Sequence, residues 1–395
     1  MGTVIVAGAR TPMGKLQGAL AALPAVELGG YAIRGALDRA GVSGDRVGYV
    51  AMGHVLQAGA GQLTARQAAV AAGIGMQVPA VTVNKVCLSG LEAVVQADRL
   101  IRLGEYEVVV AGGMESMSQA PHLLPGSRTG TKYGDTRLLD SMITDGLLDV
   151  YTDLVMGALT ERANARFEVD RAAQDAWAAR SHQLAAKAQA DGVLGEEIVP
   201  VPVPAKRGTT VQVDEDEGIR PDSSAETLAR LRPSFPDESG EGTITPASAS
   251  QLSDGAAALL VMDEQTARDL GLQPLARIGS YATVAGPDSS LQLQPANAIR
   301  AATAKAGLTP EDLDLVEINE AFAAVALASV ADLGVEQGKV NACGGAIALG
   351  HPLGMSGARL VLHLALALRR RGGGRAAAAL CGGGGQGEAL LLEVR

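Results

Sequence analysis

Short runs of consecutive apolar residues alternate with longer amphipathic segments along the first part of the chain. Apolar runs bordered by turn-forming residues lie at 4–8, 49–53, 81–84 and 108–113. Runs of this kind are typical of strands that are buried on both faces. Segments with helical periodicity lie between them, at 25–40, 63–72 and 88–103. This alternation predicts an α/β fold in which helices cover both faces of a sheet.

The last part of the chain repeats this pattern. Helices are predicted at 296–306, 321–332 and 357–371, and strands at 313–318, 376–383 and 389–394. Ser89-Gly90, a long helix and the strand VVVAGG align with Ser356-Gly357, a long helix and the strand AAALCGG. Two stretches of similar order predict an internal duplication.

The segment 120–247 breaks the pattern. It contains clustered prolines at 200–204, an acidic run at 214–217 and one clear helix. That helix is predicted to start behind Asp170, a good N-cap residue, and to run to Gly192. We interpret the segment as an insertion that lies over the functional site, and we expect its acidic run to be a solvated loop.

Composition narrows the class of protein. A chain of 395 residues is too long for one ordinary core, so at least two domains are expected. The formal net charge of −10 and the aromatic content of 3% argue against binding nucleic acid. No apolar run reaches the roughly 18 residues of a membrane span, and the first residues lack the layout of a signal peptide. We therefore expect a cytoplasmic protein that binds neither nucleic acid nor membrane.

Three cysteines are too few for a disulfide framework, and none forms a C-x-x-C pair, so a structural metal site is not expected either. Cys87 lies between a predicted strand and a predicted helix. The partial positive charge of a helix N-terminus lowers the pKa of a thiol and favours the nucleophilic thiolate. The alternative is a small buried core residue, which is the common fate of a free cysteine.

Three further polar positions could take part in chemistry. Cys381 precedes four glycines, whose backbone N–H groups suit an oxyanion hole, although a plain tight turn would look the same. His351, in the loop segment GHPLG, is placed to act as a general base or is a core histidine. Asn319 opens NEAFA after a buried strand, as a helix N-cap or as a group that positions a water or a substrate oxygen. Cys343, near the His351 loop, is interpreted as structural.

Taken together, these segments resemble the thiolase family along nearly the whole chain. The motifs that carry the resemblance occur in thiolase order, and they are VIVAGARTPMGK, NKVCLSGLEA, VVVAGGMESMSQAPH, NEAFA, GGAIALGHPLGMSGARLV and CGGGGQG. A combination of this length is highly specific. NKVCLSG is more similar to the biosynthetic acetyl-CoA acetyltransferases than to the degradative enzymes of β-oxidation.

The resemblance implies a duplicated fold, with two βαβαβαββ halves in a layered α-β-α-β-α arrangement and an inserted loop domain. The N-terminal half would comprise 1–119 plus 248–272, the loop domain 120–247, and the C-terminal half 273–395. The resemblance also implies coenzyme A and acyl-CoA as substrates, no prosthetic group, no metal, and a homodimer or homotetramer that acts in fatty acid metabolism.

The same motifs imply a role for each catalytic residue. Cys87 would be the acylated nucleophile, and Cys381 would be the acid/base thiol. His351 would activate Cys87 and, with a water bound to Asn319, would hold the thioester or enolate oxygen. The backbone N–H groups of Cys87 and Gly383 would form a second oxyanion hole.

Three positions match residues that lie near coenzyme A in the family. Ser250, in ASASQLSDG, corresponds to a serine near the pantetheine, and Phe322, in NEAFA, is assigned to the same binding region. Arg220, in GIRPDSS, corresponds to a basic residue near the nucleotide part. Lys206, Arg207 and Arg220 would make a local basic patch in an acidic protein.

Three departures from the family pattern concern acyl-chain preference rather than the catalytic set. The His-Met-Gly of the loop domain reads Val155-Met156-Gly157, and Asn-x-Asn-Gly-Gly reads Asn341-Ala342-Cys343-Gly344-Gly345. The segment that often supplies a pocket-blocking Met reads GPDSSLQLQPA, with Leu291 or Leu293 in its place.

The predicted activity is the reversible Claisen condensation of two acetyl-CoA molecules to acetoacetyl-CoA and CoA, through an acyl-cysteine intermediate. Within the family, the alternative is a broad-range 3-ketoacyl-CoA thiolase of fatty-acid degradation. A ketoacyl synthase is a remote alternative, because it would need a second histidine where this chain has Cys381. A non-catalytic scaffold is another, although such a protein would be expected to lack a catalytic residue.

Overall fold

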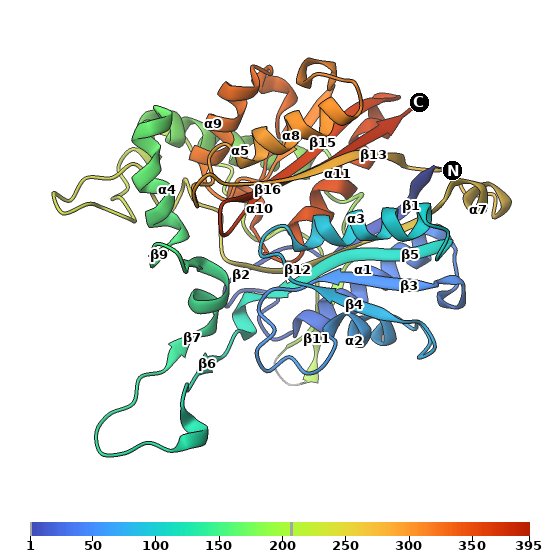
Figure 1. Ribbon diagram of the computed structural model, residues 1–395, viewed down its shortest axis with the longest axis horizontal. Helices are drawn as coiled ribbons and strands as arrows, with labels where there is room; N and C mark the ends of the chain where they lie inside the picture. Colours follow the sequence, from blue (N-terminus) through green and yellow to red (C-terminus); the bar gives the residue numbers. More distant parts are fainter. Residues whose placement is uncertain (1, 206–207) are drawn as a thin grey trace.

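The computed structural model describes residues 2–205 and 208–395, and its centre is a large mixed sheet (Figure 1). The short strand β2 (Gly14–Lys15) pairs with β12 at the side of this sheet. The other strands are, in spatial order, β14 (Leu315–Ile318), β15 (Gly374–Gly382), β16 (Gln386–Val394), β13 (Ala276–Ala285), β1 (Thr3–Arg10), β12 (Ser253–Asp263), β5 (Val108–Ser116), β3 (Tyr49–Gly53) and β4 (Ala80–Val83).

Parallel pairing is confined to the two ends of the sheet. β3 runs parallel to β4 and β5, and β14 runs parallel to β15. The pairs from β15 through β16, β13, β1 and β12 to β5 are antiparallel. Apolar runs predict burial on both faces, and here antiparallel strands are buried in this way as well as parallel ones.

Helices cover the sheet and lie between its two halves. Their bounds are α1 (Ala25–Ala40), α2 (Thr64–Ala71), α3 (Ser89–Arg102), α7 (Glu264–Asp269), α8 (Gln294–Lys305), α9 (Ala323–Leu333), α10 (Ala346–Leu349) and α11 (Ser356–Arg371). None of the helices in the described part of the chain is both long enough and apolar enough to cross a membrane.

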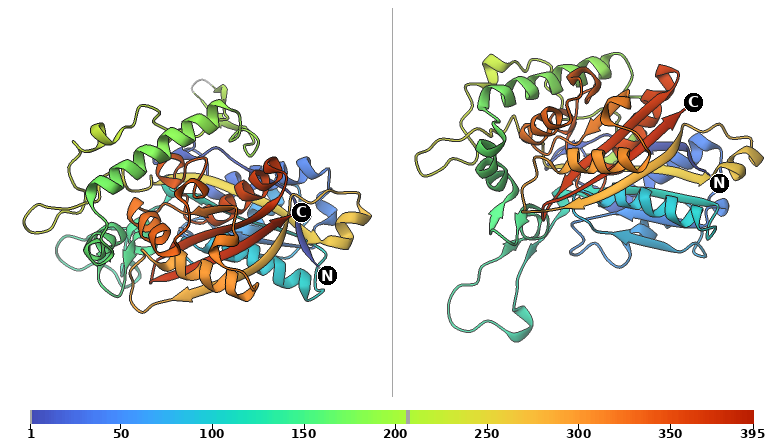
Figure 2. Two further views of the ribbon diagram at one scale, coloured as in Figure 1. Left: turned by 90° about the horizontal axis from the view of Figure 1, so that it is seen from above. Right: turned by 45° about the horizontal axis from the view of Figure 1, so that its top comes forward.

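Alternate residues of the strands belong to different hydrophobic clusters, which divides the molecule into layers. Val108 and Val110 of β5 belong to the cluster of α1 and α2, whereas Val109 belongs to that of α3 and α11. In the other half, Ala378 of β15 belongs to the cluster of α3 and α11, and Ala379 to that of α8 and α9. The layers therefore follow the order α-β-α-β-α, with α3 and α11 in the middle (Figure 1, Figure 2).

The two halves repeat one strand order, as the duplication predicts. In the first half the order is β4-β3-β5-β12-β1. In the second half the order is β14-β15-β16-β13. Outside β14, Val340 forms a single parallel bridge with Val316 and takes the place of a fifth strand. The strand equivalent to β4 is thus reduced to a single bridge in the second copy.

The segment 117–252 joins β5 and β12, which are direct neighbours in the sheet, so it leaves the fold and returns to the same place. Asp170 caps α5 by accepting a hydrogen bond from Ala173 N at 2.7 Å, as predicted. The expectation of one clear helix is incomplete, because α4 has no capping side chain and shows no start signal in the sequence. The elements of this segment are β6 (His122–Leu123), β7 (Leu139–Asp140), β8 (Leu148–Asp149), β9 (Leu154–Val155), α4 (Met156–Asn164), α5 (Arg171–Ala190), β10 (Val201–Pro204), β11 (Thr210–Val213) and α6 (Ala225–Leu228).

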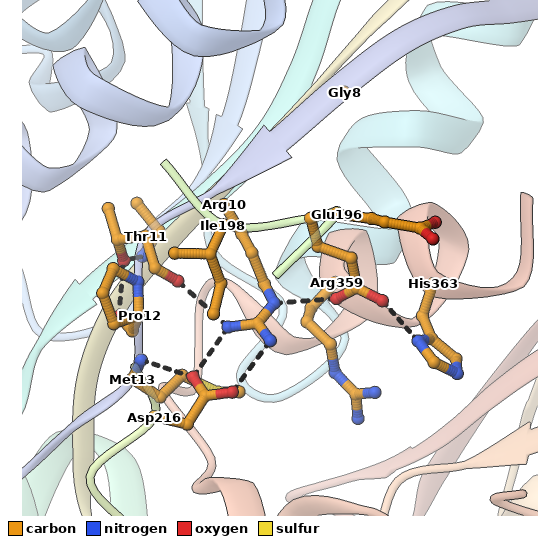
Figure 3. A network of polar contacts seen from close by, with 12 residues as sticks. Gly8, Arg10, Thr11, Pro12, Met13, Glu196, Ile198, Asp216, Arg359 and His363 are labelled. Atoms are coloured by element: carbon orange, nitrogen blue, oxygen red, sulfur yellow. Dashed lines mark hydrogen bonds and ion pairs between the residues drawn. The ribbon is translucent and has the colours of Figure 1, made fainter. Parts of the chain in front are cut away.

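Only part of the acidic run at 214–217 is solvated, because Asp214 and Glu215 are exposed whereas Asp216 is buried and Glu217 is half-buried. Asp216 is buried and accepts hydrogen bonds from the Arg10 guanidinium at 2.7 and 2.8 Å and from Met13 N at 2.9 Å (Figure 3). Arg10 also contacts Glu197 at 2.8 Å, and Glu197 contacts His363 of α11. A buried arginine requires charged partners. The expectation is wrong for Asp216, because its partner Arg10 lies in β1, far away along the chain.

Candidate active site

Cys87 lies on a tight turn between β4 and α3. Its neighbour Val86 has a φ of +52°, a left-handed conformation that is strained for a β-branched residue. Val86 N donates to Asn84 Oδ1 at 3.1 Å, and Ser89 N donates to Val86 O at 3.0 Å. These hydrogen bonds hold the strained turn and place Cys87 directly before the first residues of α3, a helix without a side-chain N-cap.

The two candidate thiols lie close enough for the charge of Cys87 to affect the pKa of Cys381. Burial raises the pKa of Cys87 to about 12, although hydrogen bonds from its own N–H and from Gly383 N–H lower it. Cys381, at the end of β15, is 1% exposed, and burial together with the charge of Cys87 raises the pKa of its thiol. The expected thiolate at the helix N-terminus is therefore wrong for the resting site, because desolvation outweighs the two backbone N–H groups that favour the thiolate. A base is needed to ionise Cys87.

His351 lies in the loop between α10 and α11, and its ring is held on both sides. Nδ1 lies 2.6 Å from Ser356 Oγ. Because the Ser356 hydroxyl donates its one proton to Pro352 O at 2.9 Å, it accepts from Nδ1. Nε2 lies 3.3 Å from Asn319 Nδ2. Burial, and then the charge of Arg359, lowers the pKa of His351 to about 4, so the imidazole is neutral and can accept a proton.

Asn319 follows β14 and does not cap a helix. The N-cap of α9 is Phe322, three residues later, so the N-cap alternative is wrong. Asn319 N donates to Ala379 O at 2.9 Å, which fixes the residue against β15. Its side-chain Oδ1 is buried and has no hydrogen-bond partner among the described residues. A buried acceptor of this kind suits a bound water or a substrate hydrogen-bond donor.

A neutral imidazole, an amide with a free acceptor and two thiols are thus supplied by segments from both halves of the fold. The family models described as "Thiolase, N-terminal domain" and "Thiolase, C-terminal domain" match residues 3–265 and 272–394. This chain belongs to the thiolase family.

Curated relatives are similar over the full length of this thiolase. A "Probable acetyl-CoA acetyltransferase" of Mycolicibacterium smegmatis is 59% identical over 98% of this chain and 100% of its own. A protein of the same name from Mycobacterium tuberculosis is 59% identical over 99% of this chain and 98% of its own. An "Acetyl-CoA acetyltransferase" of Cupriavidus necator is 49% identical over 99% of this chain and 98% of its own.

Ser250 and Phe322 lie on neighbouring segments of this thiolase, and Phe322 packs in the cluster of Cys381. Ser250 is half-buried, and its N–H donates to Ala321 O at 3.0 Å. The preceding Ala249 forms a β-bridge with Phe322. Phe322 is buried in the same hydrophobic cluster as Cys381. The structure therefore places Phe322 in the cluster of Cys381, with Ser250 beside the Ala321-Phe322 segment.

Arg220 is not part of this group. It is exposed on the inserted segment, and its backbone N–H donates to His182 Nδ1 at 3.2 Å. Lys206 and Arg207, the other members of the expected basic patch, lie outside the described residues.

Two of the three departures from the thiolase pattern lie at the cluster of Cys381. Leu291 is buried in the cluster of Cys381, and Leu293 is a half-buried neighbour in it. Met156 also packs there, directly after Val155, the N-cap of α4. Cys343 is half-buried and packs against a different cluster.

Glu320 is a residue that the sequence left without a role. Its buried carboxylate accepts hydrogen bonds from Trp177 Nε1 at 2.9 Å, Ser181 Oγ at 2.7 Å, Asn341 Nδ2 at 2.9 Å and Ile347 N at 3.1 Å. It thereby ties α5 of the inserted segment to Asn341 and to α10, the short helix that precedes the His351 loop. Its place next to Asn319 in NEAFA could have singled it out from the sequence. Its hydrogen-bond partners could not be predicted, because they are far away along the chain.

Ser356 was also missed, although it lies in the motif that contains His351. Its spacing of five residues from the histidine does not show that the loop folds back onto α11. Among the described residues, no group of three or more His, Cys, Asp or Glu side chains is arranged to hold a metal ion.

Proposed function

We propose that this thiolase is an acetyl-CoA acetyltransferase, which condenses two acetyl-CoA molecules to acetoacetyl-CoA and CoA and catalyses the reverse cleavage. One observation carries the proposal. The Cys87 sulfur accepts a hydrogen bond from the Gly383 N–H group and interacts electrostatically with the Cys381 thiol. The names of relatives up to 59% identical over the full chain support the acetyl-transferring assignment.

In the first half-reaction, the neutral imidazole of His351 takes the proton of Cys87. The thiolate attacks the thioester carbonyl, the tetrahedral intermediate collapses, and CoA leaves as the acyl group stays on Cys87. The low pKa of His351, about 4, supports a base that is unprotonated at neutral pH. Asn319 Oδ1 would hold the water that, with His351, stabilises the negative oxygen.

When CoA departs in the first half-reaction, the Cys381 thiol gives it a proton and is left as a thiolate. In the second half-reaction, this Cys381 thiolate removes a proton from the α-carbon of a second acetyl-CoA. The resulting enolate attacks the acyl group on Cys87, and the oxyanion that forms is held by the N–H groups of Cys87 and Gly383. Collapse releases acetoacetyl-CoA and returns the Cys87 thiolate. The raised pKa of Cys381 supports this role, because a weakly acidic thiol forms a strongly basic thiolate.

The remaining assignments belong to the same proposal. Ser250 and Phe322 contact the pantetheine of coenzyme A, and Arg220 lies near its nucleotide part. The enzyme needs no prosthetic group, is cytoplasmic, acts in fatty acid metabolism and forms a homodimer or homotetramer. We also propose the domain division at 119/120, 247/248 and 272/273, which the direct pairing of β5 with β12 supports.

The test is CoA-dependent cleavage of acetoacetyl-CoA beside a C8 3-ketoacyl-CoA, with Cys87→Ala as the control. A strong preference for acetoacetyl-CoA is expected, because Leu291, Leu293 and Met156 fill the space around Cys381. Equal or faster turnover of the C8 substrate would instead assign a broad-range 3-ketoacyl-CoA thiolase. No turnover of either substrate would contradict the proposed function.

A further inference from the structure

Glu115 is a buried carboxylate to which the proposed reaction assigns no role. It lies in β5, is 0% exposed, and accepts hydrogen bonds from three backbone N–H groups. These come from Leu56 at 3.1 Å, Val55 at 3.2 Å and Gly354 at 2.9 Å. Because a desolvated carboxylate depends on such partners, their positions are coupled to its own.

One side of this arrangement leads to Cys87. Val55, whose N–H binds Glu115, accepts a hydrogen bond at its carbonyl oxygen from Asn84 Nδ2 at 3.3 Å. Asn84 Oδ1 in turn accepts from Val86 N, in the strained turn that presents Cys87. The side chains of Val55, Val86 and Cys87 also share one hydrophobic cluster. The carboxylate therefore holds the segment that supports the nucleophile.

The other side leads to His351. Gly354 lies three residues after the histidine, in the same loop. A Cβ on Gly113 of β5 would lie 1.8 Å from Gly354 O, and one on Gly53 would lie 2.6 Å from it. The loop is thus pressed against the ends of β3 and β5, and the Glu115 carboxylate fixes its N–H at that position.

The charge of Glu115 also reaches the reacting sulfur. Burial raises the pKa of Glu115 to about 7 against the three N–H groups that lower it, and Asp254 of β12 raises it further. His54 Nε2 lies 3.4 Å from the carboxylate, but burial lowers the pKa of this histidine to about 4, so it supplies no positive charge. The Glu115 anion raises the pKa of Cys87.

We propose that Glu115 is a positioning residue, whose carboxylate binds the His351 loop directly and the Cys87 turn through Val55, and so sets their relative placement. The inference rests on the proposed function, which gives Cys87 and His351 their roles. Glu115 does not touch substrate in this scheme and acts through the two segments that it joins.

The test compares Glu115→Gln and Glu115→Asp with a matched control, Asp254→Asn. Asp254 is also a buried carboxylate, but it binds Ser118 N and Ser118 Oγ rather than either catalytic segment. Steady-state cleavage of acetoacetyl-CoA gives kcat and KM. Alkylation of Cys87 by iodoacetamide, followed by mass spectrometry across pH 5–9, reports the thiol without any substrate.

We expect Glu115→Gln to lower kcat by roughly 10–100-fold, with KM changed less than about 3-fold, because misplacement of reacting groups by about 1 Å has effects of this size. In the wild type, the alkylation rate should flatten near pH 7 as Glu115 ionises and disfavours the thiolate. Glu115→Gln should lose this inflection. Glu115→Asp should keep the inflection and lose kcat. Asp254→Asn should keep kcat and show the inflection at a lower pH, because Asp254 raises the pKa of Glu115.

A wild-type kcat and an unchanged pH profile in Glu115→Gln would overturn the proposal. So would equal losses of kcat and thermal stability in Glu115→Gln and Asp254→Asn, because that result describes a role in folding alone. If the wild type does not cleave acetoacetyl-CoA, the proposed function fails. The alkylation profiles still decide whether Glu115 acts on Cys87.

Discussion

Cys87 and Cys381 are chemically alike, but their different surroundings suit them to different proposed roles, as nucleophile and as base. Cys87 keeps part of its surface exposed and accepts two backbone N–H groups at its sulfur, whereas Cys381 is almost fully buried next to it. The first arrangement suits a nucleophile whose acyl group needs an oxyanion hole. The second suits a base that is shielded from water.

Replacing each thiol in turn should separate the two half-reactions. We expect Cys87→Ala to abolish acylation by acetyl-CoA, measured as an acetyl mass increase of the intact protein. Cys381→Ala should still acylate, but its condensation rate should fall by about 10²–10⁴-fold, the usual contribution of a general base. Cys343→Ala is the control and should keep both activities. Condensation at the normal rate in Cys381→Ala would disprove the role of the second thiol.

At the scale of elements, the central helices α3 and α11 meet through glycines close to the catalytic residues. A Cβ on Gly357 would lie 2.3 Å from Leu91 N, and one on Gly90 would lie 2.7 Å from Gly354 O. These approaches join the helix that follows Cys87 to the loop that carries His351. The glycines therefore set the geometry of the site as well as the packing of the middle layer.

Gly357→Ala should destabilise the protein by about 1–3 kcal/mol, because the new methyl group meets backbone that cannot move aside. We expect kcat to fall at the same time, since the strain is relieved by moving α11 and the His351 loop. Chemical denaturation and steady-state assays measure the two effects. Gly338→Ala is the control, because its Cβ would meet its nearest neighbour at 3.5 Å. Equal stability of the two variants would contradict the packing argument.

At the scale of the whole molecule, one buried group of charges joins parts that are distant in sequence. Arg10 of β1 binds Asp216 and Glu197 of the inserted segment, and Glu197 binds His363 of α11 (Figure 3). Burial alone would lower the pKa of His363. The carboxylates of Glu197 and Glu317 and a hydrogen bond that His363 donates to the Cys343 sulfur outweigh burial and raise this pKa to about 10.

This raised pKa predicts how stability depends on pH. A histidine that binds its proton more tightly when folded contributes stability that is complete below its ordinary pKa, about 6.5. We therefore expect the free energy of unfolding to fall as the pH rises from about 6.5 to 10, by at most about 3–5 kcal/mol, the size of a broken buried pair. Denaturant titrations at several pH values measure it. Glu197→Gln should reduce the slope, and an unchanged slope in that variant would contradict the assignment.

Much of the fold was open to prediction from local pattern. The bounds of α1 and β3 agree with the predicted 25–40 and 49–53, and the other predicted helices and strands differ at their ends by a few residues. Capping predicted the start of α5 behind Asp170. β12 and β13 were not singled out, and the mixed pairing of the sheet was not predicted. Strand partners depend on contacts between distant segments, which apolar runs do not encode.

The sequence by itself determined which segments form helices and strands, the duplication, the family and the identity of the candidate catalytic residues, because these depend on local pattern and motif. Only the tertiary structure decided their chemical state. It showed that burial keeps Cys87 protonated and His351 neutral, that Asn319 is not a helix cap, and that Asp216 is buried rather than solvated. Desolvation and partner charges act through space, so they follow from the packing of segments that are far apart in the chain.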